Sequence, residues 1–156
     1  MTEIITENSS LLDRYYDERA LSSLPGQGYD PYFQFGQIQW GYDLIEDLDG
    51  ADSVVNPIPT DMTELQNVFH TSDALYSYNN GSIIITTSIA TGEIPEGESY
   101  QFSALGILDA VPGLVAVCVM LPMYVYSNRG LDATIIIKLA KDGTVESMSA
   151  KVTPKK

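Results

Sequence analysis

The sequence predicts an α+β fold, a mainly antiparallel β-sheet domain with a short N-terminal helix and a second short helix. Three observations lead to this prediction. The two segments with helical periodicity both precede residue 70. Runs of β-branched and aromatic residues, separated by Gly, Asn and Pro, fill the rest of the chain. The second half lacks the strand–helix alternation that a parallel sheet needs.

The first helix is predicted over about residues 10–24. Ser10 and Asp13 have the spacing of a capping box, in which side chains satisfy free backbone N–H groups. Apolar residues then recur at steps of four and form one stripe: Leu12, Tyr16, Ala20 and Leu24. Pro25 and Gly26 end the helix.

The second helix is predicted to start at Asp61, with Glu64 three positions later and Pro59 just before it. Its apolar face would consist of Met62, Leu65, Val68 and Phe69. The acid-rich loop over 41–59 would lead into this helix.

Several strands are predicted from local patterns. The apolar alternation over 32–40 changes phase at Gly36, which predicts a β-bulge there. Asn80-Gly81 lies between two β-forming runs and predicts a hairpin, because both residues tolerate positive φ. Further strands are predicted at 100–108, 114–121 and 133–139, with a break at Pro122, and Asp142-Gly143 would close a last hairpin.

The run Leu114–Leu121 is apolar at every position, which predicts a central strand covered on both faces. It is too short to span a membrane, and the N-terminal residues lack the pattern of a secretory signal. The 156 residues suit one domain over 1–150, followed by a basic flexible tail over 151–156.

The charge is strongly negative and unevenly distributed. The net charge is −13, and positions 20–128 hold 13 acids and no Lys or Arg. Six of the eight basic residues fall in the last 28 positions. An acidic body disfavours nucleic acid and anionic membranes as partners. The charge either keeps the protein in solution or lets acidic and basic regions meet in an assembly.

Residues with catalytic or ligand-binding potential are few. The lone His70 follows the second predicted helix and is expected to be a partner of its dipole or a surface residue. The lone Cys118 lies in an apolar run and is expected to be buried. Asp47, Asp49 and Asp52 are weak Ca²⁺ candidates, since their spacing departs from that of an EF-hand. The sequence predicts no catalytic residue, no cofactor and no enzymatic function.

A series of short motifs resembles the N-terminal domain of phage tail fibres, the tail-collar fibre family. The most distinctive stretch is Leu105-Gly106-Ile107-Leu108-Asp109 followed by Gly113-Leu114-Val115-Ala116-Val117, which is similar to the family's "iGLfD" and "G-x-L-x-A-V". Two further motifs, Thr63–Asn67 and then Ile94-Pro95, precede this stretch. Two more, Leu121-Pro122 and Gly130–Ile136, follow it. The resemblance covers roughly residues 10–140.

The resemblance implies a structural virion protein, assembled in the host cytoplasm: a short fibre base or adaptor that links a tail baseplate protein to a distal tail fibre protein. It also implies a homotrimer. Aromatic anchors and basic side chains are the candidate interface residues: Trp40, Tyr124, Tyr126, Arg129, Lys151, Lys155 and Lys156. The alternative is a small β-rich module that binds carbohydrate or a receptor through exposed tyrosines and Trp40.

Overall fold

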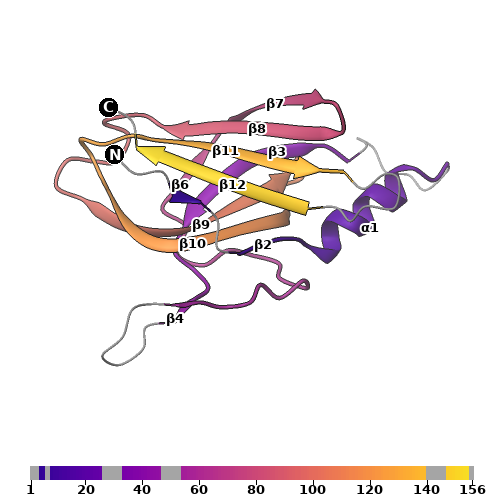
Figure 1. Cartoon of the computed structure of the whole chain (residues 1–156), viewed down its shortest axis with the longest axis horizontal. Helices are drawn as coiled ribbons and strands as arrows, with labels where there is room; N and C mark the ends of the chain where they lie inside the picture. The colour runs from indigo at the N-terminus through magenta and orange to yellow at the C-terminus, as the bar shows by residue number, and fades with distance from the viewer. Residues whose placement is uncertain (1–3, 6–7, 26–32, 47–53, 140–146, 155–156) are drawn as a thin grey trace.

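Two five-stranded antiparallel sheets pack face to face in the computed structural model, which describes residues 4–5, 8–25, 33–46, 54–139 and 147–154 (Figure 1). Sheet A contains, in spatial order, β1 (Ile4–Ile5), β12 (Ser147–Pro154), β11 (Leu131–Lys138), β8 (Ser82–Ile89) and β7 (Ala74–Asn79). Sheet B contains β2 (Asn8–Leu11), β10 (Leu114–Tyr126), β9 (Ser99–Asp109), β3 (Phe35–Gly41) and β6 (His70–Ser72). A ribbon of β4 (Ile45–Glu46) and β5 (Val54–Val55) and the helix α1 (Asp13–Ser22) complete the described elements.

The predicted α+β class is therefore wrong, because the second helix is absent from the described residues and the fold is a β-sandwich. Residues 61–69 form turns and irregular backbone instead. Asn67 adopts φ 49°, which a right-handed helix cannot accommodate. The Gln66 N–H donates to the Asp43 carboxylate at 3.0 Å, and the Phe69 N–H donates to the Trp40 carbonyl at 2.9 Å. These long-range bonds replace the bonds that a helix would form.

The main core lies between the two sheets. In β11 and β12, buried and exposed residues alternate, so that only one face of sheet A is covered. Ile135 and Val152 of sheet A are fully buried against a layer from sheet B that includes Trp40 and Phe102. The antiparallel pairing predicted for the strands is confirmed throughout the described ladders.

Sheet B is also covered on its outer face. The covering segment, residues 42–46 and 54–69, passes beneath this face and includes β4, at the bottom of Figure 1. Its apolar side chains pack on Val117 and Val119 of β10 and on Ala104 of β9. All residues from Leu114 to Met120 are consequently buried, which confirms the prediction of a strand covered on both faces. Leu121 is the exception, at 47% exposed.

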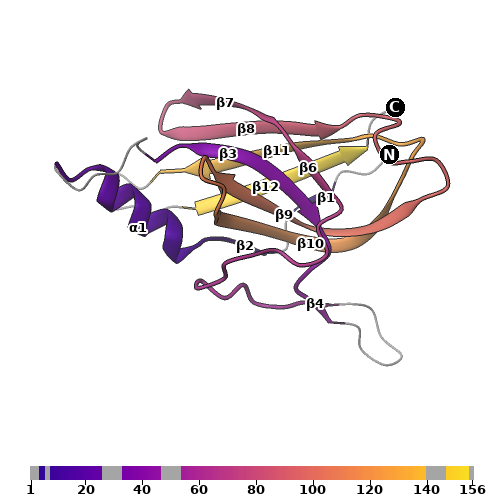
Figure 2. The same cartoon turned by 180° about the vertical axis from the view of Figure 1, so that it is seen from behind.

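Two pairs of strands connect the sheets along their sides, as the rear view shows (Figure 2). On one side, β1 pairs with β12 of sheet A, and β2 then pairs with β10 of sheet B. On the other side, β6 pairs with β3 of sheet B, and β7 then pairs with β8 of sheet A. Changing sheets in this way holds the two layers together at both borders.

The predicted bulge at Gly36 and the predicted hairpin at Asn80-Gly81 are confirmed. The β3–β9 register shifts between Phe35 and Ile38, which places the predicted bulge at Gly36. A Cβ atom at Gly36 would overlap the Asp109 carbonyl, so only glycine fits there. Asn80 and Gly81 adopt φ 47° and 87°, as a type I′ hairpin turn requires. The predicted break at Pro122 is a register shift within one continuous strand, β10.

The N-terminal helix exists but starts later than predicted. Ser10 belongs to β2, and Leu12 is the N-cap residue, without a side-chain hydrogen bond. Of the predicted stripe only Leu12 is buried. Tyr16 and Leu24 are about half exposed, whereas Tyr15 and Glu18 are the buried residues of the helix.

The C-terminal region also differs from the prediction. Residues 151–154 belong to β12 instead of a flexible tail, because their alternating Val152 and Pro154 pack inward beside β11. The predicted Asp142-Gly143 hairpin lies outside the described residues.

Candidate interaction surfaces

A buried ionic network attaches α1 to the sandwich. Arg14 lies between two carboxylates: its Nη2 is 2.7 Å from Glu18 Oε1, one helical turn along, and its Nε is 2.8 Å from Asp109 Oδ2 at the end of β9. The carboxylate side chains are 7% and 2% exposed, whereas that of Arg14 is 40% exposed. The arginine therefore compensates acids that burial would otherwise penalise.

Asp109 also organises the hairpin that connects β9 to β10. Its Oδ1 accepts hydrogen bonds from the backbone N–H of Val111 at 3.1 Å and of Gly113 at 2.7 Å. Burial raises the pKa of the Asp109 carboxyl. Hydrogen bonds shared with Glu18 and donated by Gly113, Arg14 and Val111 outweigh this effect, and the net pKa is lowered. The carboxylate is thus held in its charged form between helix and hairpin.

Gly113 is required by the same network. A Cβ atom at this position would overlap the Arg14 guanidinium. Glycine at position 113 therefore leaves the space in which the Arg14 side chain reaches Asp109, although Arg14 lies 95 positions before Asp109 in the chain. The "iGLfD" and "G-x-L-x-A-V" motifs thus meet at the point where α1 joins the sandwich.

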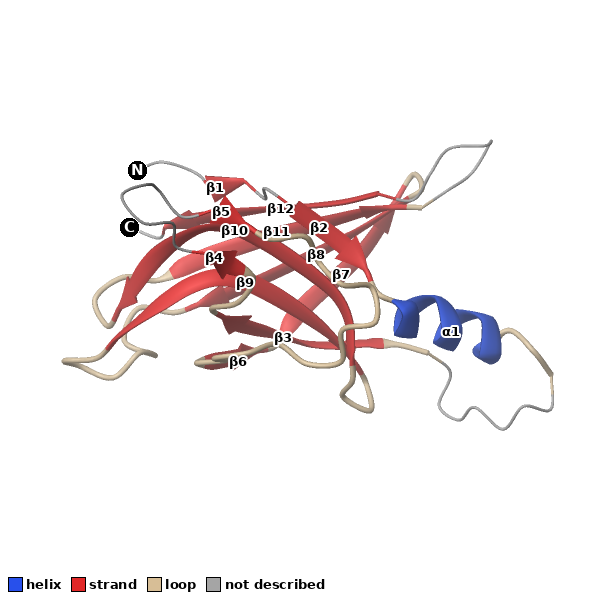
Figure 3. Ribbon diagram, turned by 90° about the horizontal axis from the view of Figure 1, so that it is seen from below, coloured by secondary structure: helices blue, strands red, loops and turns tan. Residues whose placement is uncertain are grey.

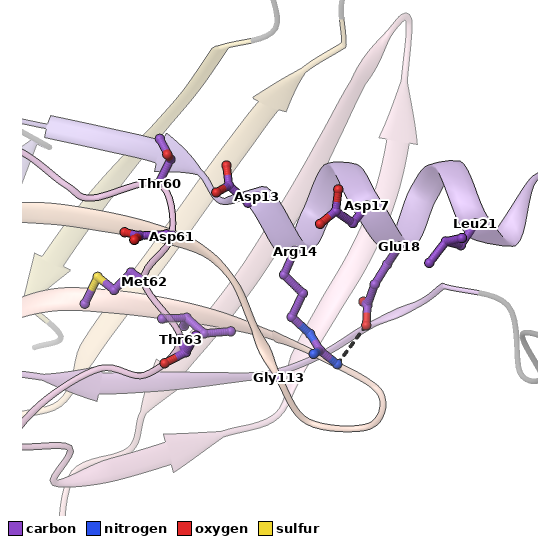
Figure 4. Close-up of a pocket in the computed structure, with 11 residues that line it drawn as sticks. Asp13, Arg14, Asp17, Glu18, Leu21, Thr60, Asp61, Met62, Thr63 and Gly113 are labelled. Carbon is purple, nitrogen blue, oxygen red and sulfur yellow. Dashed lines mark ion pairs between the residues drawn. The ribbon is translucent and has the colours of Figure 1, made fainter.

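A groove of about 460 Å³ opens beside this network (Figure 4). One wall is α1, which contributes Asp13, Asp17 and Leu21, and the other is the turn over residues 60–63. Figure 4 shows Arg14 and Glu18 pointing toward each other at the end of the groove nearest Gly113. The groove combines acidic walls with apolar side chains.

The helix and the turn that follows it carry apolar side chains into solvent. The helix projects from the end of the sandwich, as the view from below shows (Figure 3). Tyr16, Leu21 and Leu24 are 48%, 40% and 51% exposed. Three exposed large apolar residues within three turns indicate a surface that another molecule can cover.

A second apolar surface lies at the opposite end of β10. Tyr124 and Tyr126 project from the same side of the strand, with ring centroids 6.4 Å apart and an interplanar angle of 21°. Both rings are about half exposed, as is Leu121 nearby. The strand begins next to Gly113 and α1, so the tyrosine pair and the helix lie toward opposite ends of the 13-residue strand.

An aromatic series continues from α1 to the border of sheet A. Tyr15 stacks on Phe35 at 6.1 Å, and Phe35 stacks on Tyr76 of β7 at 5.8 Å. The Tyr76 hydroxyl donates to the Gly36 carbonyl, and burial raises the pKa of Tyr76 to about 12. Next to Phe35 and Tyr76, an open groove of about 450 Å³ is bordered by Tyr78 and Ile83.

The structure places the predicted interface residues in different environments. Trp40 is fully buried, and its indole N–H donates to Ser72 Oγ at 2.9 Å, so the prediction that it is a surface anchor is wrong. Tyr124 and Tyr126 lie together and exposed. Arg129 follows β10 in the adjacent turn and is partly buried.

The remaining basic candidates are Lys151, Lys155 and Lys156. Lys151 is exposed on β12 of the other sheet. Lys155 and Lys156 lie outside the described residues, as do the calcium candidates Asp47, Asp49 and Asp52. Among the residues that the structure describes, no group of three or more His, Cys, Asp or Glu side chains could hold a metal ion.

His70 and Cys118 have structural environments. His70 begins β6, so the predicted helix dipole is absent, and its Nε2 lies 2.9 Å from Glu93 Oε2. Cys118 is buried, as predicted, and burial raises the pKa of its thiol to about 12. Such a thiol is poorly nucleophilic.

Sequence reasoning missed Arg14, Glu18 and the edge of β7. Arg14 and Glu18 are four positions apart on the helix, which was a readable signal for an ion pair. The motif aspartate, Asp109, was quoted without a role. No local pattern indicated that it would lie next to Arg14.

A comparison with protein families identifies the class of this chain. The family model described as "Bacteriophage P1 tail fiber protein R" matches residues 5–141. The match covers most of the chain, which therefore belongs to this family, and the predicted resemblance to phage tail fibres is confirmed. A search of the curated proteins and a search of the solved structures each returned no significant match.

The family makes the chain a phage tail component of structural type. Within the described part of the chain, no helix is long and apolar enough to cross a membrane.

Proposed function

We propose that the protein attaches a tail fibre to the tail baseplate as a fibre base or adaptor. It would act by binding a baseplate protein at one end and a distal fibre protein at the other. The homotrimer implied by the resemblance, and assembly in the host cytoplasm, belong to this proposal.

The observation that carries the proposal is the presence of exposed apolar surfaces at both ends of β10. One is on α1 and the turn after it (Tyr16, Leu21 and Leu24), and the other is the pair Tyr124 and Tyr126 with Leu121. Aromatic and aliphatic anchors of this kind dominate the affinity of protein interfaces. Two such surfaces toward opposite ends of one strand suit a protein that joins two partners.

The rigid attachment of α1 supports the same role. An adaptor transmits force between partners, so its exposed helix needs a firm connection to the sandwich. Arg14 and Asp109 provide a buried ionic contact at that junction. Tyr15, buried beneath the helix, adds an aromatic contact to Phe35.

The test is to separate the two attachments by mutation in the phage that encodes the chain. Leu21→Arg with Leu24→Arg should abolish one attachment, and Tyr124→Ala with Tyr126→Ala should abolish the other. Particles and free fibres would be purified, and the protein would be located in each by immunoblotting and electron microscopy. One double variant should remain with the particle and the other with the detached fibre.

Matched controls come from exposed polar positions near each surface. Asp17→Asn on α1 and Gln101→Ala, opposite Tyr124 on β9, should leave both attachments intact. If both double variants remain on the same partner, the two-ended role is wrong. The mass of the native complex with each partner tests the homotrimer.

Carbohydrate binding is a second candidate, favoured by the exposed, nearly parallel rings of Tyr124 and Tyr126. Such rings can stack on the apolar faces of sugars. Trp40 is removed from this candidate by its burial. Glycan-array binding by the isolated protein that disappears in Tyr124→Ala would favour this function over the adaptor role.

A further inference from the structure

The edge strand β7 leaves backbone hydrogen-bonding groups without a strand partner. Among the described strands it pairs only with β8, and it forms one border of sheet A, at the top of Figure 1. Asn79 and Ser82 flank the two-residue turn and form a hydrogen-bonded pair. The alternation of an antiparallel ladder then directs the N–H and C=O groups of Tyr76 and Tyr78 away from β8.

Among the described residues, this edge lacks the charges, prolines and bulges that usually protect an edge strand. Natural edges carry lysine, proline, a bulge or a covering loop, which prevent unwanted pairing. From Ala74 to Asn79 the chain has no charge and no proline, and its register with β8 is regular. Leu75 is 78% exposed and Tyr78 is 67% exposed. An unprotected edge of this kind indicates a strand that is covered in the assembled state.

A groove lies where the side chains of an added strand would point. Tyr76 and Tyr78 face the same side of sheet A as the buried Ile85, so they stand over the space between the sheets. The groove of about 450 Å³ next to them is bordered by Phe35 and Ile83. A strand paired with β7 would place alternate side chains into this groove, which provides specificity in strand addition.

The charge pattern indicates the character of the added strand. Residues 74–92 contain no charged side chain and are bounded by Asp73 and Glu93. An acidic segment is repelled by a chain of net charge −13, whereas a segment with a basic end is attracted. An antiparallel partner of β7 would have its C-terminal end next to the exposed Asp73.

We infer that β7 is a strand-addition site for another polypeptide of the tail. The occupant is an extended segment that alternates large apolar with small polar residues, contains no acid and has Lys or Arg at its C-terminal end. Its apolar residues enter the groove between Tyr78 and Phe35, and its backbone pairs with Tyr76 and Tyr78. The inference rests on the proposed attachment role, to which it adds a site and a partner chemistry.

The experiment uses amide hydrogen exchange of the whole chain, with and without the peptide Thr-Val-Thr-Phe-Thr-Val-Thr-Lys. The amides of Tyr76 and Tyr78 should exchange at least ~10-fold more slowly with peptide, because they gain hydrogen bonds. The amides of Leu75 and Ser77 already face β8 and should change little. Replacing the peptide lysine by glutamate should weaken binding several-fold at low salt and less at high salt.

Two variants separate the contribution of the Tyr78 backbone to peptide binding from that of its side chain. Tyr78→Pro removes the outward N–H without removing a bond to β8, and should lower peptide affinity ~10-fold or more. Tyr78→Ala keeps the N–H and should lower it less. Circular dichroism would show that each variant folds, and the exchange measurement on the unaltered chain tests the site without any variant.

Several results would overturn the inference. One is unchanged amide exchange at Tyr76 and Tyr78 in the presence of saturating peptide. Another is equal peptide affinity of Tyr78→Pro and the unaltered chain. A third is protection of β7 that rises with protein concentration when no peptide is present. The last result would identify a second copy as the occupant. In fibres isolated from particles, residues 74–79 should be protected relative to the free chain. If the protein is not found in the particles at all, the adaptor role is contradicted. The binding of the peptide to β7 would still stand on its own.

Discussion

Sheet B and sheet A have the same number of strands but differ in how they are covered. Sheet B has sheet A on one face and the covering segment on the other, so β10 is buried at every position from Leu114 to Met120. Sheet A is covered on one face, and β11 alternates between buried and exposed residues. The two sheets thus show in one molecule how a second cover changes the sequence that a strand can carry.

The difference also separates stability from recognition. Sheet B holds α1 through Asp109 and contains the positions least able to accept a polar side chain. Sheet A presents its outer face and the edge of β7 to solvent. We therefore expect substitutions in sheet B to affect folding and those on the outer face of sheet A to affect it little.

The largest effect is expected from a charge placed under both covers. Val117→Asp in β10 should prevent folding, because the carboxylate would be buried without a partner, and Val117→Ala should cost about 1–3 kcal/mol. Thr134→Asp, at a half-exposed position of β11, is the matched control and should fold. Circular dichroism and soluble yield measure both, and a folded Val117→Asp protein would contradict the double cover.

The next effect concerns the ionic network between helix and hairpin. Asp109→Asn should destabilise the protein by about 1.5–3 kcal/mol, because it removes the ion pair with Arg14 and weakens the hydrogen bonds that the buried carboxylate accepts. Chemical denaturation would measure the change. Asp132→Asn, exposed on β11, should have a much smaller effect, and equal losses at the two positions would show that the network adds no stability.

The same carboxylate makes stability depend on pH. The pKa of Asp109 is lowered in the folded state, so its contribution is complete above the ordinary Asp pKa of about 4. The contribution is lost as the pH falls through the lower folded value. The denaturation midpoint of Asp109→Asn should therefore fall less steeply below pH ~4 than that of the unaltered chain. Parallel curves for the two proteins would exclude this explanation.

A smaller effect is expected at Gly113. Gly113→Ala introduces a methyl group that Arg14 must avoid, and we expect a loss of about 1–3 kcal/mol. Gly92→Ala is a control with open space around it, although its φ of 93° is also unfavourable for alanine. In the double variant Gly113→Ala with Arg14→Ala the steric part of the loss should disappear. Additive losses would refute the contact.

The smallest effect compares neighbouring isoleucines in β11. Ile136→Thr, on the outer face of sheet A, should cost less than about 1 kcal/mol, since the residue is half-buried and remains β-branched. Ile135→Thr places a hydroxyl in the main core and should cost clearly more. Thermal melting of the two variants measures the difference, and a reversed order would mean that the outer face of sheet A is covered.

The sequence predicted those parts of the fold that depend on neighbouring residues. The Asn80-Gly81 turn, the Gly36 bulge and the buried run of β10 were readable because φ preference, alternation and hydrophobicity act locally. The prediction of a second helix was wrong because Asp43 and Trp40, both distant in sequence, accept hydrogen bonds from the backbone N–H groups near Asn67. Helical periodicity cannot compete with such contacts.

The candidate surfaces were predictable only in part. Tyr124 and Tyr126 alternate on one strand, so their common side was readable from the sequence. The burial of Trp40 was not, because it depends on Phe102 and Ser72 from other strands of the sandwich. The unprotected edge of β7 could not be predicted either, because recognising an edge strand requires the order of strands within the sheet.

The strands that connect the two sheets determine when the chain can complete its fold. β1 pairs with β12, so Ile4 can reach its partner Val152 only after residue 152 has been synthesised. Contacts between such distant segments are slow to form, because the intervening loop must first close. In a nascent chain, β10, its most apolar strand, is therefore synthesised before sheet A is complete and can cover it. Newly made chains should depend on rapid release or on chaperones until β12 joins the sheet.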